Sequence, residues 1–443
     1  MTVAPEHPRY HGDKAARVFW GVVVCFGLWQ VLTYRRDFYL IIDDWAFFGT
    51  RLDLLATSGV DDFLLRRHNE HLMGGMVLWD VGIAKLFGLR SYTPWVLSVQ
   101  VANAFVAWIM WRYSIRIGLH RFAAALLCPF LMIWGPFDRV GYWAPEAIFW
   151  LTLALAMSQF ALTALSEESR KRDVAGAAVG TLGVFVQSIC VVVVPITVVV
   201  LAVKRRWISA MIATAPIVTY SVWLLTYARR DDAYRWEIGG SYAQVRDAHL
   251  IFDFTWQILS RTMWQSAFAP LAVILFVLIV LGVNELWRKG GDGRTIAIAS
   301  LVASVFYISG FIWSRGYATI RIFRMEIPSR YASVIAMLLL PIAAVGLTRA
   351  MSLLPAMSRL GGKAKLVCGA GALVLLFALN AYQRLDNHTQ DMEIASFTRR
   401  TIDAAINDPG LDDRTTTDFV FGESVFFDLN YGDLLRFRRL GWL

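Results

Sequence analysis

Two adjacent carboxylates, Asp43 and Asp44, follow the first apolar stretch of this chain. Neighbouring acids repel each other, so at least one should have a raised pKa or a cationic partner. A half-buried carboxylate at a bilayer boundary is a good general base, and it could also bind a metal ion or a sugar hydroxyl. A helix cap needs only one such side chain. We therefore predict that the pair is catalytic, with a cap or a solvated turn as the alternative.

A second polar cluster, His68, Glu70 and His71, lies further along the same segment. His68 and His71 are three residues apart, so on a helix they would share one face. With a carboxylate from the first pair they could bind a divalent ion such as Mg or Mn. The spacing is not that of the HExxH zinc motif. We predict an acceptor or metal site here, with an exposed polar helix as the alternative.

Asp138 and Glu146 flank a Gly/Pro-rich turn that leads into a later apolar stretch. Glu146 follows Pro145 in the first turn of that expected helix, where the helix dipole favours an anion. Ionisable groups at a membrane boundary also tend to be functional. Both acids are therefore assigned to the acceptor or metal site, and helix capping is the alternative for Glu146.

Several arginines crowd the short polar segment 315–330 between two late apolar stretches. A guanidinium suits a phosphate or pyrophosphate, and a lipid-linked phosphate is the natural anion at that depth. We predict a donor-phosphate site, with non-specific headgroup binding as the alternative. The residues assigned to it are Arg321, Arg324, Arg330, Tyr331 and, in an earlier apolar run, Lys85. Snorkelling to the interface is the alternative for Lys85.

The composition indicates which scaffold must position these groups. The 443 residues are 57% hydrophobic and 17% charged, with a mean hydropathy of +0.50, whereas soluble proteins carry about 25% charged residues. Apolar runs long enough to cross a bilayer recur along the chain. We predict an all-α, polytopic integral membrane protein. The formal net charge of +9 comes from bases clustered in loops, which indicates topology rather than nucleic-acid binding.

Basic clusters mark the cytoplasmic side of a membrane protein, which places Asp43 and Asp44 outside. A run at 174–203 is basic at both ends, so we predict a hairpin that turns near Gln187 and Ser188, with a single helix as the alternative. Residues 73–89 carry Asp80 and are expected to form a juxtamembrane or re-entrant helix. The other predicted spans are 18–34, 94–112, 121–137, 145–165, 207–227, 267–287, 295–313, 330–348 and 366–382.

These spans number about eleven when the hairpin counts as two. The expected division is a transmembrane domain at 1–382, which includes a first external loop at 35–93 with juxtamembrane helices, and a small external C-terminal segment at 383–443.

The order of the motifs resembles the GT-C integral-membrane glycosyltransferases, chiefly the protein O-mannosyltransferase-like and aminoarabinose-transferase-like families. The resemblance rests on acids just after the first span, a His/Glu cluster before a short helix ending Lys85-Leu86-Phe87-Gly88, and the turn Ala144-Pro145-Glu146-Ala147. It covers roughly residues 15–165. Beyond that it is topological, apart from Ser329-Arg330-Tyr331 leading into a late span.

The resemblance implies a GT-C-like fold in which Asp44 or Asp43 is the base. Glu70 and Glu146 would shape the acceptor or metal site, and arginines would bind the donor phosphate. The His-Pro-Pro string of many relatives is absent, as is the large external domain of oligosaccharyltransferases, so a sequon-recognising role is not expected.

The predicted function is transfer of a sugar from a polyprenyl-phosphate donor to a cell-envelope glycan or lipid acceptor, with inversion at the anomeric carbon. The enzyme would lie in the plasma or inner membrane among lipids, with its site facing outside. No cofactor is demanded, and a divalent metal stays open. A transporter or flippase for a lipid-linked substrate is one alternative, although it would place charges within mid-membrane helices. A non-catalytic envelope-assembly scaffold is the other.

Overall fold

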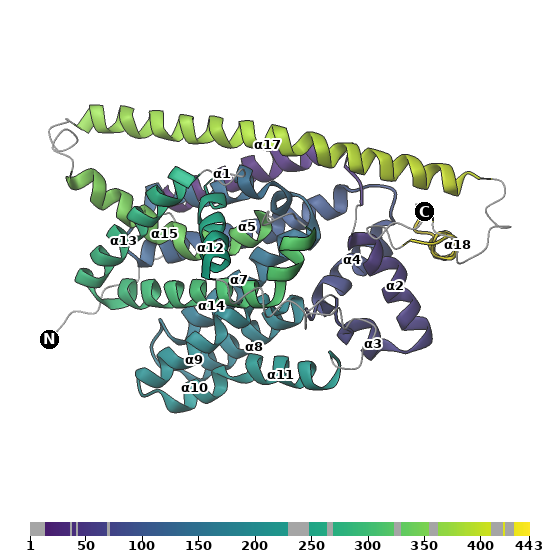
Figure 1. Ribbon diagram of the computed structural model, residues 1–443, viewed down its shortest axis with the longest axis horizontal. Coiled ribbons are helices and arrows are strands. Elements are labelled where there is room, and N and C mark those ends of the chain that lie inside the picture. Colours follow the sequence, from purple (N-terminus) through teal and green to yellow (C-terminus); the bar gives the residue numbers. More distant parts are fainter. Residues whose placement is uncertain are drawn as a thin grey trace.

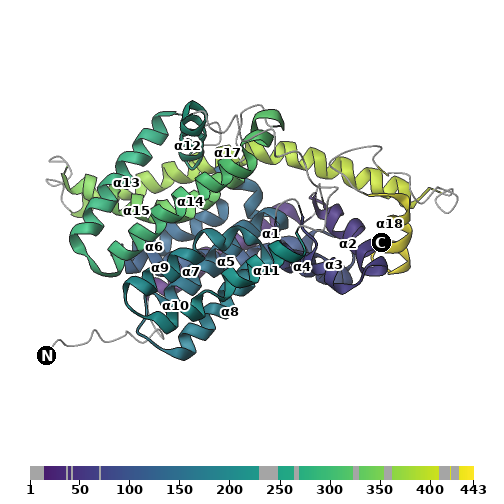
Figure 2. The ribbon, with the colours of Figure 1, turned by 60° about the horizontal axis from the view of Figure 1, so that its bottom comes forward.

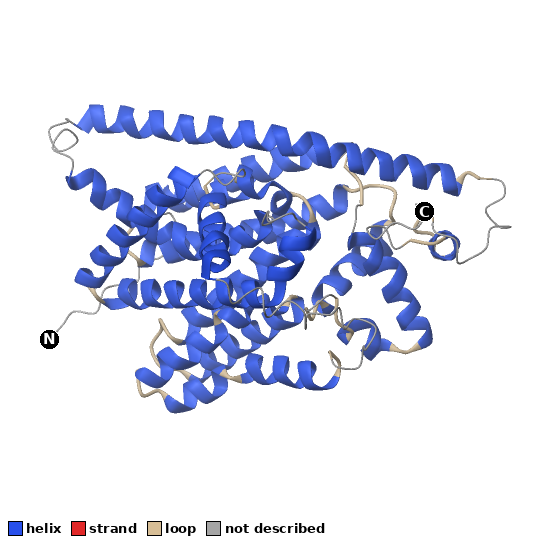
Figure 3. Cartoon of the chain, viewed as in Figure 1, coloured by secondary structure: helices blue, strands red, loops and turns tan. Residues whose placement is uncertain are grey.

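The structure is a computed structural model that describes residues 14–35, 38–40, 43–68, 71–228, 248–263, 269–322, 329–353, 362–408, 420 and 429–443. Over these residues the chain forms helices joined by turns, and no β-strand occurs among them (Figure 3). The all-α prediction is therefore confirmed.

The elements are α1 (Lys14–Tyr34), α2 (Asp43–Thr57), α3 (Val60–Leu65), α4 (Gly74–Phe87), α5 (Thr93–Arg116), α6 (Arg121–Leu127), η1 (Cys128–Ile133), η2 (Gly135–Gly141), α7 (Ala144–Thr163), α8 (Arg170–Val186), η3 (Ser188–Val192), α9 (Val194–Val203), α10 (Trp207–Ala213), α11 (Ala215–Thr226), α12 (Ala248–Arg261), α13 (Ala269–Lys289), α14 (Gly291–Ile322), α15 (Ser329–Leu353), α17 (Gly362–Ile406) and α18 (Tyr431–Arg439).

Seven segments of the described chain are long and apolar enough to cross a membrane: α1, α5, α7, α10 with α11, α13, and most of α14 and α15. Two shorter apolar segments, Arg121–Ile133 and Ser188–Val203, accompany them. Helices suit this setting because a lipid offers no partner to a backbone N–H or C=O. The chain is therefore a multi-pass membrane protein, as predicted.

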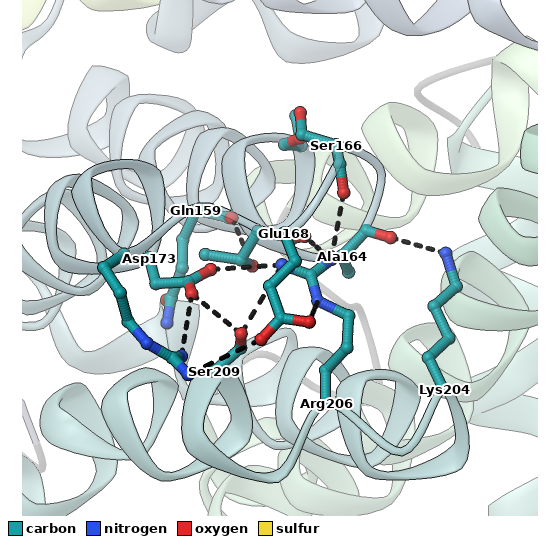
Figure 4. Close-up of polar contacts among 11 residues, drawn as sticks. Gln159, Ala164, Ser166, Glu168, Asp173, Lys204, Arg206 and Ser209 are labelled. Carbon is teal, nitrogen blue, oxygen red and sulfur yellow. Dashed lines mark hydrogen bonds and ion pairs between the residues drawn. The ribbon is translucent and has the colours of Figure 1, made fainter.

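The predicted hairpin at 174–203 is confirmed. The chain leaves α8 at Gln187, passes through η3 and returns as α9. Thr152 of α7 stabilises the turn, because its hydroxyl donates to the carbonyls of Gly183 and Gln187, each at 2.7 Å. At the other end of the hairpin, Lys204 Nζ donates to the carbonyl of Ala164 at 2.6 Å (Figure 4).

A charged cluster joins the open end of this hairpin to its neighbours. Asp173, which is fully buried, accepts hydrogen bonds from Arg206 at 3.3 Å and from Ser209 at 2.7 Å (Figure 4). Nearby, Arg116 donates to the carbonyl of Leu165 at 3.2 Å and lies 3.9 Å from Asp292. Loops whose basic residues marked the cytoplasmic side in the sequence therefore meet at one end of the molecule.

The prediction of one continuous span at 121–137 is wrong, because the segment is divided into α6, η1 and η2. Prolines and a glycine interrupt the α-helical hydrogen bonds there. Buried amides replace those bonds: Gln30 donates to the carbonyl of Met132 at 2.8 Å, and Gln100 and Asn103 donate to those of Gly141 and Val140 at 2.6 and 3.1 Å. Such side-chain partners allow irregular backbone to lie inside a membrane protein.

Helices α2, α3 and α4 lie together at one end of the molecule, beside α18 (Figures 1 and 2). Helix α4 is the short helix expected at 73–89, and it ends at Phe87, followed by a Gly88 cap whose φ of 71° suits glycine. Helix α17 runs along one flank toward this end (Figure 1). It continues without a break through residue 382, where a domain boundary was expected.

Candidate functional site

Helix α2 carries the first acid pair at its N-terminal end, where the helix dipole favours a negative charge. The Asp44 side chain is 0% exposed, and its Oδ2 accepts a hydrogen bond from the indole Nε1 of Trp143 at 3.0 Å. The side chain of Asp43 lies outside the described residues. Asp44 is thus held against the start of α7 and does not form a solvated turn.

A second buried acid, Asp80 on α4, faces the same region. Its side chain is 0% exposed, and Oδ1 accepts from Trp95 Nε1 at 3.0 Å. Burial and then the nearby Asp44 carboxylate raise the pKa of Asp80 well above its usual range, which the Trp95 hydrogen bond only partly offsets. The ring of Phe48, one helical turn after Asp44, meets Trp95 edge-on at 6.2 Å.

Sequence reasoning missed Asp80 as a site residue. The sequence analysis used Asp80 only to predict that residues 73–89 do not span the membrane. A single carboxylate inside an apolar run was the available signal, because such a residue is buried only at a cost that function often explains. The acid pair that the structure brings together is therefore Asp44 and Asp80.

Aromatic residues surround the two acids. Tyr92 is buried, stacks on Trp95 with ring centroids 6.1 Å apart, and donates its hydroxyl to the carbonyl of Tyr142 at 3.0 Å. Burial raises the pKa of Tyr92, and the charges of Asp44 and Asp80 raise it further. The phenol therefore stays neutral.

An ion pair joins the first turn of α7 to the start of α15. Glu146 is 3% exposed, and its Oε1 lies 3.0 Å from Arg330 Nη1. The Arg330 guanidinium also lies 5.2 Å from the ring centroid of Tyr331. The predicted members Glu146, Arg330 and Tyr331 are therefore neighbours, although the sequence analysis assigned them to two different subsites.

A second ion pair joins η2 to α17. Arg139 Nε and Nη2 donate to the two carboxylate oxygens of Asp391 at 2.9 and 2.6 Å, and the Tyr142 hydroxyl donates to Asp391 as well. Arg139 lies 5.8 Å from the ring centroid of Trp143 and interacts electrostatically with Glu146. Trp143 is therefore in contact both with Asp44 and with the arginine that anchors α17.

The histidine cluster does not form the predicted helical face. His68 and His71 pair through two backbone hydrogen bonds of 3.0 Å each, N–H to C=O in both directions, which is the geometry of a tight turn. The helical prediction is wrong because α3 ends at Leu65, before the cluster. His71 Nδ1 lies 3.2 Å from the Ser188 hydroxyl in η3, and Glu70 lies outside the described residues.

The remaining predicted residues are placed only in part. Lys85 is exposed in the last turn of α4, next to the exposed apolar side chains of Leu86 and Phe87, which fits the snorkelling alternative. Arg324 lies outside the described residues, as do the side chains of Asp138 and Arg321. Arg330 and Tyr331 are thus the members of the expected phosphate site whose surroundings are described.

The described residues do not fit a metal centre. Among them, no three His, Cys, Asp or Glu side chains come close enough to hold an ion. Asp44 and Asp80 form a pair without a third such ligand, and Glu70 with the side chains of Asp43 and Asp138 are outside this set. We therefore derive no step through a metal.

Comparison with known proteins identifies the fold. No protein-family model matches the sequence, and no curated protein matches it. The crystal structure of ArnT from Cupriavidus metallidurans in the apo state matches with a TM-score of 0.55 and 15% identity, over 95% of this chain and 85% of ArnT. The structure of that protein bound to undecaprenyl phosphate matches with a TM-score of 0.53 and 13% identity, over 95% of this chain and 84% of ArnT. The chain therefore shares the polytopic helical fold of these ArnT structures.

Proposed function

We propose that this protein is a membrane glycosyltransferase that takes a sugar from a polyprenyl-phosphate donor and transfers it to a cell-envelope glycan or lipid. The observation that supports this most is that the start of α7 contacts both the proposed base and the proposed phosphate-binding arginine. Trp143 binds the buried Asp44, and Glu146 pairs with Arg330. They do so within a fold shared with a protein that binds undecaprenyl phosphate.

The proposed reaction is a single displacement. The Asp44 carboxylate accepts the proton of the acceptor hydroxyl while that oxygen bonds to the anomeric carbon. The bond from the anomeric carbon to the phosphate oxygen breaks, and polyprenyl phosphate leaves with the bonding electrons. Attack opposite the leaving group inverts the anomeric configuration.

Arg330 is proposed to stabilise the leaving phosphate, whose negative charge grows as the sugar departs. Glu146 holds the guanidinium at the start of α15, and a guanidinium has enough N–H donors to bind a carboxylate and a phosphate together. The ring of Tyr331 supports the same group from another side. The lipid phosphate would then meet an arginine that is already oriented.

The charge distribution supports a cell-membrane location with the site outside. Basic loops that include Arg116, Lys204 and Arg206 gather at one end of the molecule, and such loops are typical of the cytoplasmic side. On this assignment α2, α4 and α18, which lie at an end of the molecule (Figure 1), face outward with the envelope acceptor.

Two variants test the proposal in membranes supplied with synthetic undecaprenyl-phosphate sugars and an envelope extract as acceptor. Asp44→Asn should lower turnover by about 100-fold or more while donor binding is largely kept. Arg330→Ala should weaken binding of undecaprenyl phosphate and lower turnover together. Released undecaprenyl phosphate and glycosylated product are measured by mass spectrometry.

Glu285→Gln is the matched control, because Glu285 pairs with Lys289 and Arg349, outside the proposed site. It should leave both binding and turnover intact. If Asp43→Asn and Asp44→Asn each transfer sugar at the wild-type rate, the base lies elsewhere, and an envelope-assembly scaffold becomes the better interpretation.

A further inference from the structure

The buried acids Asp44 and Asp80 lie on two different juxtamembrane helices that pack against each other. Each is 0% exposed, and each has one carboxylate oxygen held by an indole N–H. Phe48 connects the surroundings of the two acids. It lies on α2 one turn after Asp44, and its ring contacts Trp95, whose indole donates to Asp80. The proposed reaction uses Asp44 and gives Asp80 no role.

Asp80 has an environment that disfavours a negative charge. The second oxygen, Oδ2, is buried and has no hydrogen-bond partner among the described residues. The carboxylate of Asp44 is the charge that acts on it most, and that charge is negative. A carboxyl group in such surroundings keeps its proton, as buried acids facing a second acid do.

Charged and titratable groups also occur on the elements packed around the pair. They include Arg51, Asp53, Asp61, Asp62, Arg67, His68, Lys85, Tyr92 and Arg436. Arg51 donates to the carbonyls of Phe63 and Asp62 at 3.3 and 3.4 Å, and Arg436 pairs with Asp53. Tyr92 interacts electrostatically with both acids, and it is a neutral phenol. None of these contacts places a cation on Asp80.

We propose that Asp80 is a positioning residue that keeps its proton near the ionised Asp44, so that the two carboxyl groups carry one negative charge between them. This inference rests on the proposed function and deepens it, because it names the partner of the base. During transfer the ionised carboxylate takes the acceptor proton, and the proton of Asp80 is retained. Both groups are then protonated, and one proton returns to solvent after the product leaves.

Two substitutions separate this role from a purely structural one. Asp80→Asn keeps a neutral, hydrogen-bonding side chain of the same shape, so turnover should fall by about tenfold or less. Asp80→Leu cannot hydrogen-bond, and turnover should fall by about 100-fold or more with little change in KM. In the wild type, kcat should decline at alkaline pH as Asp80 loses its proton, and Asp80→Asn should abolish that decline.

A measurement that needs no activity tests the same proton. The infrared band of a protonated carboxyl group should be present in the wild type at neutral pH and absent in Asp80→Asn, and it should shift in Asp44→Asn. Asp173→Asn is the matched control, because Asp173 is equally buried but pairs with Arg206 at 3.3 Å (Figure 4). Its loss should leave the band unchanged.

The outcomes separate the two proposals. If the band disappears in Asp80→Asn but no donor supports transfer by the wild type, the proposed function fails and the protonated state of Asp80 stands. If transfer is observed and Asp80→Asn keeps both the band and the alkaline decline, a protonated Asp80 is excluded. If Asp80→Asn is as inactive as Asp44→Asn, Asp80 must work as an ionised group and the inference is overturned.

Discussion

The indole of Trp442 lies edge-on against the ring of Phe48, with the ring centroids 6.3 Å apart. Phe48 follows Asp44 by one helical turn, so Trp442 packs one turn away from the candidate base. The Trp442 carbonyl also accepts from the Leu89 amide at 2.6 Å, and Arg436 of α18 pairs with Asp53 of α2. The C-terminal segment therefore holds α2 and the end of α4 in place.

Trp442→Ala should destabilise the protein and lower turnover together. The side chain is 7% exposed and stacks on Phe437, and removing a buried aromatic ring costs about 3–5 kcal/mol. Thermal unfolding in detergent and the transferase assay measure the two effects. Leu440→Ala is the control, since that side chain is 50% exposed. A Trp442→Ala protein with wild-type stability would show that α18 does not support α2.

Gly88→Ala should be destabilising, whereas Gly82→Ala in the same helix should not. Gly88 has a φ of 71°, and a Cβ there would lie 2.8 Å from the Trp442 carbonyl oxygen. A Cβ at Gly82 would meet nothing within 4 Å, so alanine should gain about 0.5–1 kcal/mol of helix propensity. Opposite shifts in the unfolding temperature are expected. Equal shifts would contradict the contact between the end of α4 and the C-terminal segment.

Gly346→Ala should disrupt the crossing of α13 and α15. A Cβ at Gly346 would lie 1.8 Å from the Leu278 carbonyl oxygen, and one at Gly282 would lie 2.1 Å from that of Ile342. Small residues allow this close approach between membrane helices. The unfolding temperature in detergent should fall for Gly346→Ala and stay level or rise for Gly310→Ala, where a Cβ meets nothing within 4 Å. Tolerance of both substitutions would exclude the close crossing.

Asp391→Asn should cost far more stability than Asp403→Asn on the same helix. Asp391 is buried and accepts two hydrogen bonds from Arg139 within 3 Å, and removing one partner of a buried ion pair costs about 3–5 kcal/mol. Asp403 forms an exposed pair with Arg399 at 3.8 Å, which is worth about 0–1 kcal/mol. Chemical denaturation of the two variants gives the comparison. A similar loss in both would mean that Arg139 does not anchor α17.

The stability of the wild type should decrease with rising pH because of Asp80. Its folded-state pKa is raised, first by burial and then by Asp44, so its contribution is complete below the unfolded pKa of about 3.9. That contribution is lost as the pH rises through the folded pKa, because the native state then holds a proton that the unfolded state has released. Asp80→Asn should therefore gain unfolding temperature relative to the wild type as the pH increases. A constant difference across that range would contradict a raised pKa.

Features that depend on one stretch of residues could be predicted. Apolar runs predicted α1, α5 and α7 because insertion depends on the hydropathy of a single segment. Bases at both ends of 174–203 predicted the turn at Gln187. Asp44 stood out because its type and its place beside the first span are both local. The His68–His71 face failed because three-residue spacing has meaning only on a helix, and α3 ends earlier.

The partners of these residues were decided by the tertiary structure alone. Asp80 lies near enough to Asp44 to feel its charge, Glu146 pairs with Arg330, and Asp391 binds Arg139, although each pair comes from different elements. Hydropathy and charge specify that a helix lies in or beside the membrane. They do not specify its rotation or its neighbours, which follow from how side chains such as Trp143 and Gly346 pack. The sequence by itself therefore determined the class of protein and one acid of the candidate site, whereas helix packing decided which charges lie beside it.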